Sequence, residues 1–231
     1  MTLPPPLSQF DLVDAAALAL LALAWFLTGR LIEHPPARWP SVTRLMVGYR
    51  HEWMRQFVTR QPRIFDANVI DSLRQGTAFF ASACMIALGG GVAVLGNSDQ
   101  LRGVAQDIAP SAATEALELR IILPLLFLAN ALLKFIWAHR LFGYCSILMA
   151  AVPNEPDDPL ALHRAAQAAE INITAGRAFN AGLRGVYFAL GSVAWLAGPI
   201  PLIIATLATV GVLMRREFAS HSRQVMLARE P

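Results

Sequence analysis

The sequence predicts an all-α, polytopic helical membrane protein with about five transmembrane helices. Three observations lead to this class. Hydrophobic residues make up 55% of the 231 residues and charged residues only 15%, whereas a soluble domain carries about 25% charged residues. The apolar residues gather in runs of about twenty, which is the length that crosses a hydrocarbon core. Arginines collect between these runs, as in cytoplasmic loops. A chain of this length suits a single integral membrane domain over residues 1–231.

The first span is expected at about 12–32. It follows ten residues without Lys or Arg, and polar residues interrupt it only at Asp14 and from Thr28 to Arg30. A cleavable signal peptide has a basic n-region and a shorter apolar core. Because neither is present, we expect a retained first span.

The connection at 33–75 is expected to be helical and cytoplasmic. Ser41 is an N-cap candidate after three prolines, and apolar residues follow it at i, i+3, i+4 spacing. Two interpretations stand for this amphipathic helix: it lies in the interface against anionic lipid, or its apolar face packs on the transmembrane bundle. The face that we assign to a lipid or to a partner comprises Arg44, Arg50, Trp53, Arg55, Phe57 and Arg60.

Two further spans are expected at about 76–95 and 121–139. Gly89-Gly90-Gly91 near the end of the first permits close helix contact or a kink. The polar residues 96–119 predict an exposed loop with a helical portion from Ser111. After the second of these spans, prolines end the apolar sequence beyond Val152, and an alanine-rich cytoplasmic helix fills the connection at 140–182.

The last apolar region, 186–214, is too long for one simple span. A single helix would be about 44 Å long, against a hydrocarbon core of about 30 Å. Gly198-Pro199 divides the region, so two short spans at 183–197 and 200–214 also fit. Only five spans put the arginines of both connections and of the tail on one side. We therefore predict five spans, with four as the alternative, in the cell inner (plasma) membrane, with the N-terminus outside and the C-terminus in the cytoplasm.

Short matches at an offset of 110 residues suggest a parallel internal repeat. Arg30-Leu31 recurs as Arg140-Leu141, and Leu73-Arg74 recurs as Leu183-Arg184. Each half would contain an inward span, a cytoplasmic helix and an outward span. Chance matches in a chain rich in Ala, Leu and Arg are the other interpretation.

Lys134 is the single lysine of the chain, and it lies inside the third span. A charge at bilayer depth costs about 3 kcal/mol on insertion scales, so it needs a partner, a wet cavity or a short reach to the surface. In one interpretation the side chain extends to the cytoplasmic interface. In the other it pairs with Glu33, Asp66 or Asp71 around a cavity. The polar path of that cavity would be lined by Lys134, Arg140, Asn130, Trp137, Tyr144, Arg30, Arg74 and Arg184.

Three motifs carry a resemblance to a known family. They are Lys134-Phe135-x-Trp137-x-x-Arg140-x-x-x-Tyr144-Cys145-Ser146-Ile147-Leu148, Arg177-x-Phe179-Asn180-x-Gly182-Leu183-Arg184-x-x-Tyr187-Phe188, and Arg215-Arg216-Glu217-Phe218. The chain resembles, over nearly its whole length, a family of bacterial and plant membrane proteins catalogued only as a domain of unknown function. Gly143 stands where that family is expected to have Asn, which weakens any role for this position. The resemblance implies an integral membrane protein and brings no reaction or ligand.

Motifs of enzymes and of metal sites are missing. His51-Glu52 has no second histidine at zinc-site spacing, and the glycine-rich stretch lies in an apolar run. We therefore expect no catalytic residue, no metal site and no cofactor. Cys84 and Cys145 lie in apolar sequence and do not suggest a disulfide framework.

Two functions from different classes remain. One is an oligomeric channel or transporter for a small solute, with a preference for anions because arginine predominates. The other is a structural or accessory membrane subunit that binds anionic lipid or a partner protein. The expected partners are anionic membrane lipid and a homo-oligomer or larger membrane assembly. Nucleic acid is not expected, because lipid head groups are the nearer anions.

Overall fold

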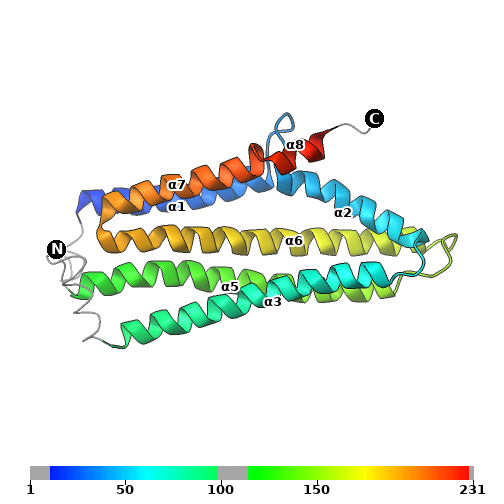
Figure 1. Cartoon of the computed structure of the whole chain (residues 1–231), viewed down its shortest axis with the longest axis horizontal. Helices are drawn as coiled ribbons and strands as arrows, with labels where there is room; N and C mark the ends of the chain where they lie inside the picture. Colours follow the sequence, from blue (N-terminus) through cyan, green and yellow to red (C-terminus); the bar gives the residue numbers. More distant parts are fainter. Residues whose placement is uncertain (1–10, 98–113, 229–231) are drawn as a thin grey trace.

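The structure is a computed structural model that describes residues 11–97 and 114–228. Within these residues every regular element is a helix, which confirms the all-α fold class. Five long helices run along a common axis (Figure 1): α1 (Leu12–Glu33), α3 (Ile64–Leu95), α5 (Thr114–Ala150), α6 (Ala161–Ser192) and α7 (Pro199–Phe218). The shorter elements are α2 (Val42–Thr59), η2 (Val193–Ala197) and α8 (His221–Leu227).

Four helical segments of the described chain are long and apolar enough to cross a membrane. They are Leu12–Glu33, Ile64–Leu95, Leu117–Ala150 and Pro199–Leu227. The spans predicted at 12–32, 76–95, 121–139 and 200–214 lie within them. The fifth, at 183–197, is the end of α6 together with η2 and is not among them, so the count of five is not confirmed. Residues 98–113 of the loop expected at 96–119 are outside the part of the chain that the structure describes. Gly96 and Asn97 follow α3, and residues 114–119 belong to α5.

A sharp turn at Gly198 separates η2 from α7. Its φ of 115° lies in the left-handed region, which glycine adopts without the steric cost of a Cβ. Pro199 follows at the first position of α7, where its fixed φ suits a helix start and its missing N–H is not needed. The last apolar region is therefore divided at the residues that the sequence indicated.

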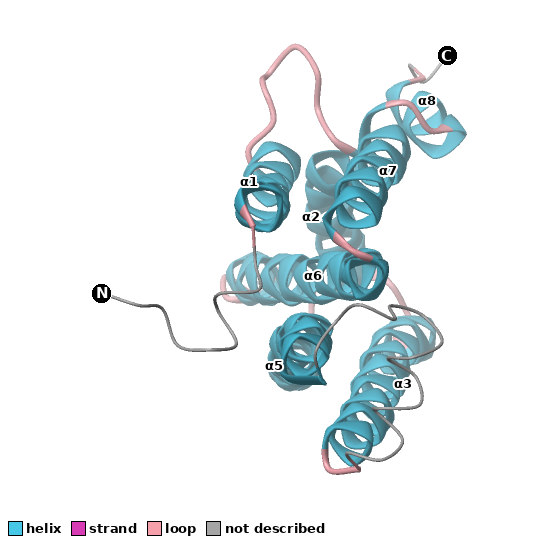
Figure 2. Cartoon of the chain, turned by 90° about the vertical axis from the view of Figure 1, so that its left-hand side faces the viewer, coloured by secondary structure: helices cyan, strands magenta, loops and turns pink. Residues whose placement is uncertain are grey.

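Helix α6 lies at the centre of the bundle. Helices α1, α2, α5 and α7 all pack against it, and Figure 2 shows α1 and α7 on one side of α6 and α5 on the other. Small residues of α6 permit these contacts. A Cβ at Gly182 would lie 2.7 Å from the Phe135 ring, and one at Gly176 would lie 2.9 Å from the Arg50 guanidinium. Because other helices cover it, α6 needs few large apolar side chains.

The bundle has two halves of different character along its axis. The apolar half comprises residues 12–33, 76–95, 117–139 and 183–214, and the basic half comprises 34–75, 140–182 and 215–228. Thirteen arginines lie in the basic half and three in the apolar half. In Figure 1, α1 and α7 end near the middle, whereas α3, α5 and α6 continue beside α2. Both arginine-rich connections and the tail therefore lie at the same end.

The apolar face of α2 packs on the bundle rather than outward. Met54, Phe57 and Val58 are buried in one cluster with residues of α5 and α6. Phe57 is only 3% exposed, so it is not available to a lipid or to an external partner. The structure therefore agrees with the second interpretation of this amphipathic helix, in which its apolar face packs on the bundle.

The internal repeat is not confirmed. The first half would match α1 with α5, yet α1 ends at Glu33 while α5 continues without a break to Ala150. Arg30 consequently lies in the last turn of its helix, whereas Arg140 lies ten residues before the end of α5.

Candidate anion-binding pocket

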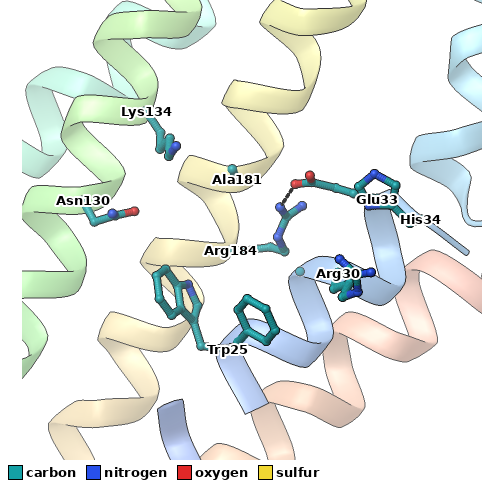
Figure 3. Close-up of a pocket in the computed structure, with 10 residues that line it drawn as sticks. Trp25, Arg30, Glu33, His34, Asn130, Lys134, Ala181 and Arg184 are labelled. Carbon is teal, nitrogen blue, oxygen red and sulfur yellow. Dashed lines mark hydrogen bonds and ion pairs between the residues drawn. The ribbon is translucent and has the colours of Figure 1, made fainter. Parts of the chain in front are cut away.

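A polar pocket of about 280 Å³ lies between α1, α5 and α6 at the level where α1 ends. Figure 3 shows that each helix forms one side of it. Its lining residues are Trp25, Phe26, Gly29, Arg30, Glu33 and His34 at α1, Asn130 and Lys134 on α5, and Ala181 and Arg184 on α6. The pocket therefore brings together four residues of the predicted polar path, namely Arg30, Asn130, Lys134 and Arg184.

The floor of the pocket is an ion pair between helices. Arg184 of α6 donates from Nη2 to Oε1 of Glu33 on α1, and the two side chains are 10% and 30% exposed. Gly29 lies beside this arginine, since a Cβ there would be at ordinary van der Waals distance, 3.8 Å, from Arg184 Nε. A buried charge requires such a partner, because an uncompensated charge in the interior is strongly destabilising. The pair therefore ties α1 to α6 and cancels its own formal charge.

Two cations of the pocket have no counter-charge in the described chain. Arg30 and Lys134 are both exposed, and neither has an ion pair or hydrogen bond with another described residue. With His34 neutral, three cations and one carboxylate give the pocket a formal charge of +2. This excess of positive charge makes the pocket suited to an anion.

The carboxylates that the sequence suggested for Lys134 are engaged elsewhere. Glu33 pairs with Arg184. Asp66 is fully buried and accepts from Arg60 and from Trp53 Nε1, the latter at 2.7 Å. Asp71 accepts from Gln75 at 2.6 Å.

A row of aromatic rings lies beside the pocket, on the side of the beginnings of α1 and α5. The rings of Trp25 and Phe127 meet edge to face with centroids 5.7 Å apart. Phe127 in turn stacks on Phe188 of α6 at 6.1 Å. All three helices that form the pocket thus contribute a ring to this row. A polar path continuing along the bundle would have to pass it.

The other four residues of the predicted path lie outside the pocket. Arg140 donates from Nε to the Tyr144 hydroxyl, and its guanidinium lies 5.5 Å from the centre of that ring. Trp137 is 49% exposed, and Arg74 belongs to α3. Arginine with tyrosine or tryptophan at the edge of an apolar zone is typical of a membrane interface.

The residues of α1 that line the pocket were missed by sequence reasoning, apart from Arg30 and Glu33. Their spacing is a signal that could have found them. Trp25, Gly29 and Glu33 are four residues apart, as are Phe26, Arg30 and His34, and such residues share a helix face. The sequence-based grouping followed charge and therefore passed over them.

The face of α2 assigned to a lipid or to a partner is largely engaged inside the chain. Arg50 donates to the side chain and backbone of Asn172, and burial lowers the pKa of its guanidinium. Trp53 and Arg60 donate to Asp66. Arg55 pairs with Glu52 at 2.7 Å on the surface. Phe57 is buried. Of this face, only Arg44 and Arg55, the latter in its surface pair with Glu52, are therefore exposed.

Comparisons with known proteins give one match. Neither the curated proteins nor the solved structures contain a match to this chain. Residues 16–222 match a protein family, and this range includes every residue of the pocket and nearly all of the described helices. The chain therefore belongs to the family described as "Protein of unknown function, DUF599".

Proposed function

We propose that this protein is an accessory subunit of the inner membrane that binds the anionic head group of a membrane lipid in the α1–α5–α6 pocket. One observation carries the proposal: Arg30 and Lys134 line a pocket in the apolar half and have no counter-charge among the described residues. An isolated cation at membrane depth is unfavourable. A bound anion would relieve this cost at both residues.

The position of the pocket supports a lipid as the source of the anion. In the apolar half, helix faces that are exposed in the chain are the faces that a bilayer covers. Phe26, at the rim of the pocket, is 61% exposed, and Arg30 and Lys134 are exposed beside it. A head group can therefore enter sideways from the bilayer, as in basic pockets between transmembrane helices.

The proposal includes an orientation. Two arginine–tyrosine pairs, Arg140–Tyr144 and Arg216–Tyr187, lie within a few residues of the pocket along α5 and α6. Such pairs suit the boundary of the bilayer. The apolar half then lies in the membrane, with α6 as a fifth pass that α1, α5 and α7 partly shield from lipid. The basic half and the C-terminus lie in the cytoplasm, and the N-terminus lies outside.

Transport of a small anion is the less supported function. It would use the same two unpaired cations. The apolar rings of Trp25, Phe127 and Phe188 lie next to the pocket in the direction that a transported anion would have to take. A path would need lining residues from a second copy of the chain. Anion flux in vesicles that is lost in Lys134→Met would favour this function over lipid binding.

The deciding experiment measures lipid affinity in neutral detergent. We expect the full chain to bind phosphatidylglycerol more tightly than phosphatidylcholine. Arg30→Gln should weaken phosphatidylglycerol binding about fivefold, because one basic contact to an anionic lipid contributes about 1 kcal/mol. Arg164→Gln is the matched control, since Arg164 lies on α6 17 residues before Ala181, which is about 25 Å from the pocket along the helix axis. Equal affinity for the two lipids would refute the proposal.

A further inference from the structure

The two unpaired cations lie on opposite walls of the pocket. Lys134 comes from α5 and Arg30 from α1, and Figure 3 shows Ala181 and Arg184 of α6 between them. The centre of the floor is occupied by the ion pair of Arg184 with Glu33. An anion placed centrally would meet the Glu33 carboxylate, which disfavours it by like-charge repulsion. Negative charge is therefore favoured at the two walls rather than at the centre.

Each wall holds a polar side chain four residues from its cation. On α5, Asn130 precedes Lys134 by four residues. At α1, His34 follows Arg30 by four residues. Asn130 and Lys134 lie next to each other on one face of α5, His34 is the cap residue directly after α1, and all four residues line the pocket. The walls therefore resemble two half-sites, each with a charged donor and a neutral polar group.

We propose that the pocket takes a lipid whose head group holds two phosphates, one at the Lys134–Asn130 wall and the other at the Arg30–His34 wall. This inference rests on the proposed function and names its ligand class. Two phosphodiesters carry two negative charges, which match the formal charge of +2 in the pocket. Cardiolipin has this chemistry, and basic pockets between transmembrane helices suit such head groups.

The test compares cardiolipin with phosphatidylglycerol, which has the same phosphodiester chemistry with one phosphate. Because two linked groups bind together more tightly than either alone, we expect cardiolipin to bind about tenfold more tightly or better at equal phosphate concentration. Native mass spectrometry should show one cardiolipin or two phosphatidylglycerol molecules per chain. Equal affinity of the two lipids would overturn the two-phosphate inference while leaving the proposed function intact. Failure of both lipids to exceed phosphatidylcholine would overturn both.

Variants assign each half-site. Arg30→Gln and Lys134→Gln should each reduce cardiolipin affinity to that of phosphatidylglycerol and lower the phosphatidylglycerol count from two to one. Lys134→Arg keeps the charge and should retain cardiolipin binding, which separates loss of charge from loss of fold. The remote control Arg164→Gln should change the affinity for neither lipid. An unchanged cardiolipin preference in both Gln variants would place the lipid elsewhere and overturn the inference.

A competition experiment with inorganic pyrophosphate distinguishes a soluble ligand from a lipid. It has two phosphates but no acyl chains. If cardiolipin is the ligand class, pyrophosphate should leave bound cardiolipin in place at millimolar concentration. Displacement of cardiolipin by pyrophosphate would assign the pocket to a soluble diphosphate instead.

Discussion

At the residue scale, Arg184 depends on Glu33 because burial leaves it no other counter-charge. Glu33→Gln should destabilise the protein by about 3 kcal/mol, at the lower end of the range for a broken buried ion pair because Glu33 is 30% exposed. Denaturant-induced unfolding in detergent measures this loss of unfolding free energy. The double variant Glu33→Gln with Arg184→Met should lose less than Glu33→Gln alone. Equal or greater loss in the double variant would show that the pair contributes no coupling.

Lys134 offers a direct measure of occupancy, because it is the only lysine of the chain. An amine-reactive acylating reagent should label the Lys134 peptide quickly in phosphatidylcholine vesicles, since the side chain is exposed. Cardiolipin should slow this labelling several-fold by covering the ammonium group. Mass spectrometry of the peptide gives the rate, and Arg30→Gln should restore part of it. Labelling that is equally slow in Arg30→Gln would point to a general surface effect instead of a bound head group.

At the element scale, close packing of α5 on α6 requires glycine at position 182. A Cβ there would lie 2.7 Å from the Phe135 ring, and Phe135 is fully buried, so the ring cannot easily move. Gly182→Val should destabilise the protein by about 1–3 kcal/mol through overpacking. Phe135→Leu should recover part of this loss.

Gly89→Ala in α3 is the matched control for that substitution. No atom lies within 4 Å of a Cβ built at Gly89, and alanine is a better helix former than glycine by about 1 kcal/mol. We expect Gly89→Ala to be neutral or slightly stabilising in the same unfolding assay. A loss as large as that of Gly182→Val would show that a second copy or another partner packs on α3.

At the scale of the whole molecule, the common end of both arginine-rich connections and the tail can be tested by labelling from one side of the membrane. Cys84 and Cys145 are buried, so single introduced cysteines are visible to an impermeant thiol reagent. Leu12→Cys should react in intact cells. Gln56→Cys and Ser222→Cys should react only after permeabilisation. Reaction of Gln56→Cys and Ser222→Cys from opposite sides would exclude five passes.

The sequence was sufficient for those features that leave a local pattern. The apolar runs predict the positions of α1, α7 and the apolar parts of α3 and α5, although α3 and α5 extend beyond the predicted spans, and the break at Gly198 follows from its Gly-Pro pair. The sequence predicted a span at 183–197, which is the end of α6 together with η2, but not the central position of α6, because that position depends on which helices pack around it. The pairing of Arg184 with Glu33 joins residues 151 positions apart. Such a contact depends on which helices are neighbours, and periodicity along one helix does not contain that information.

The shielded position of α6 also bears on how the chain is built into a membrane. In the proposed orientation, the buried face of α6 within the apolar half includes Arg184, Gly185 and Ser192, so the segment would gain little by leaving the translocation channel for lipid on its own. Its most extensive contact is with α5, the helix synthesised immediately before it. We therefore expect α5 and α6 to enter the membrane together as a helical hairpin. A ribosome that stalls after α5 and before α6 would leave α5 without the helix against which it packs.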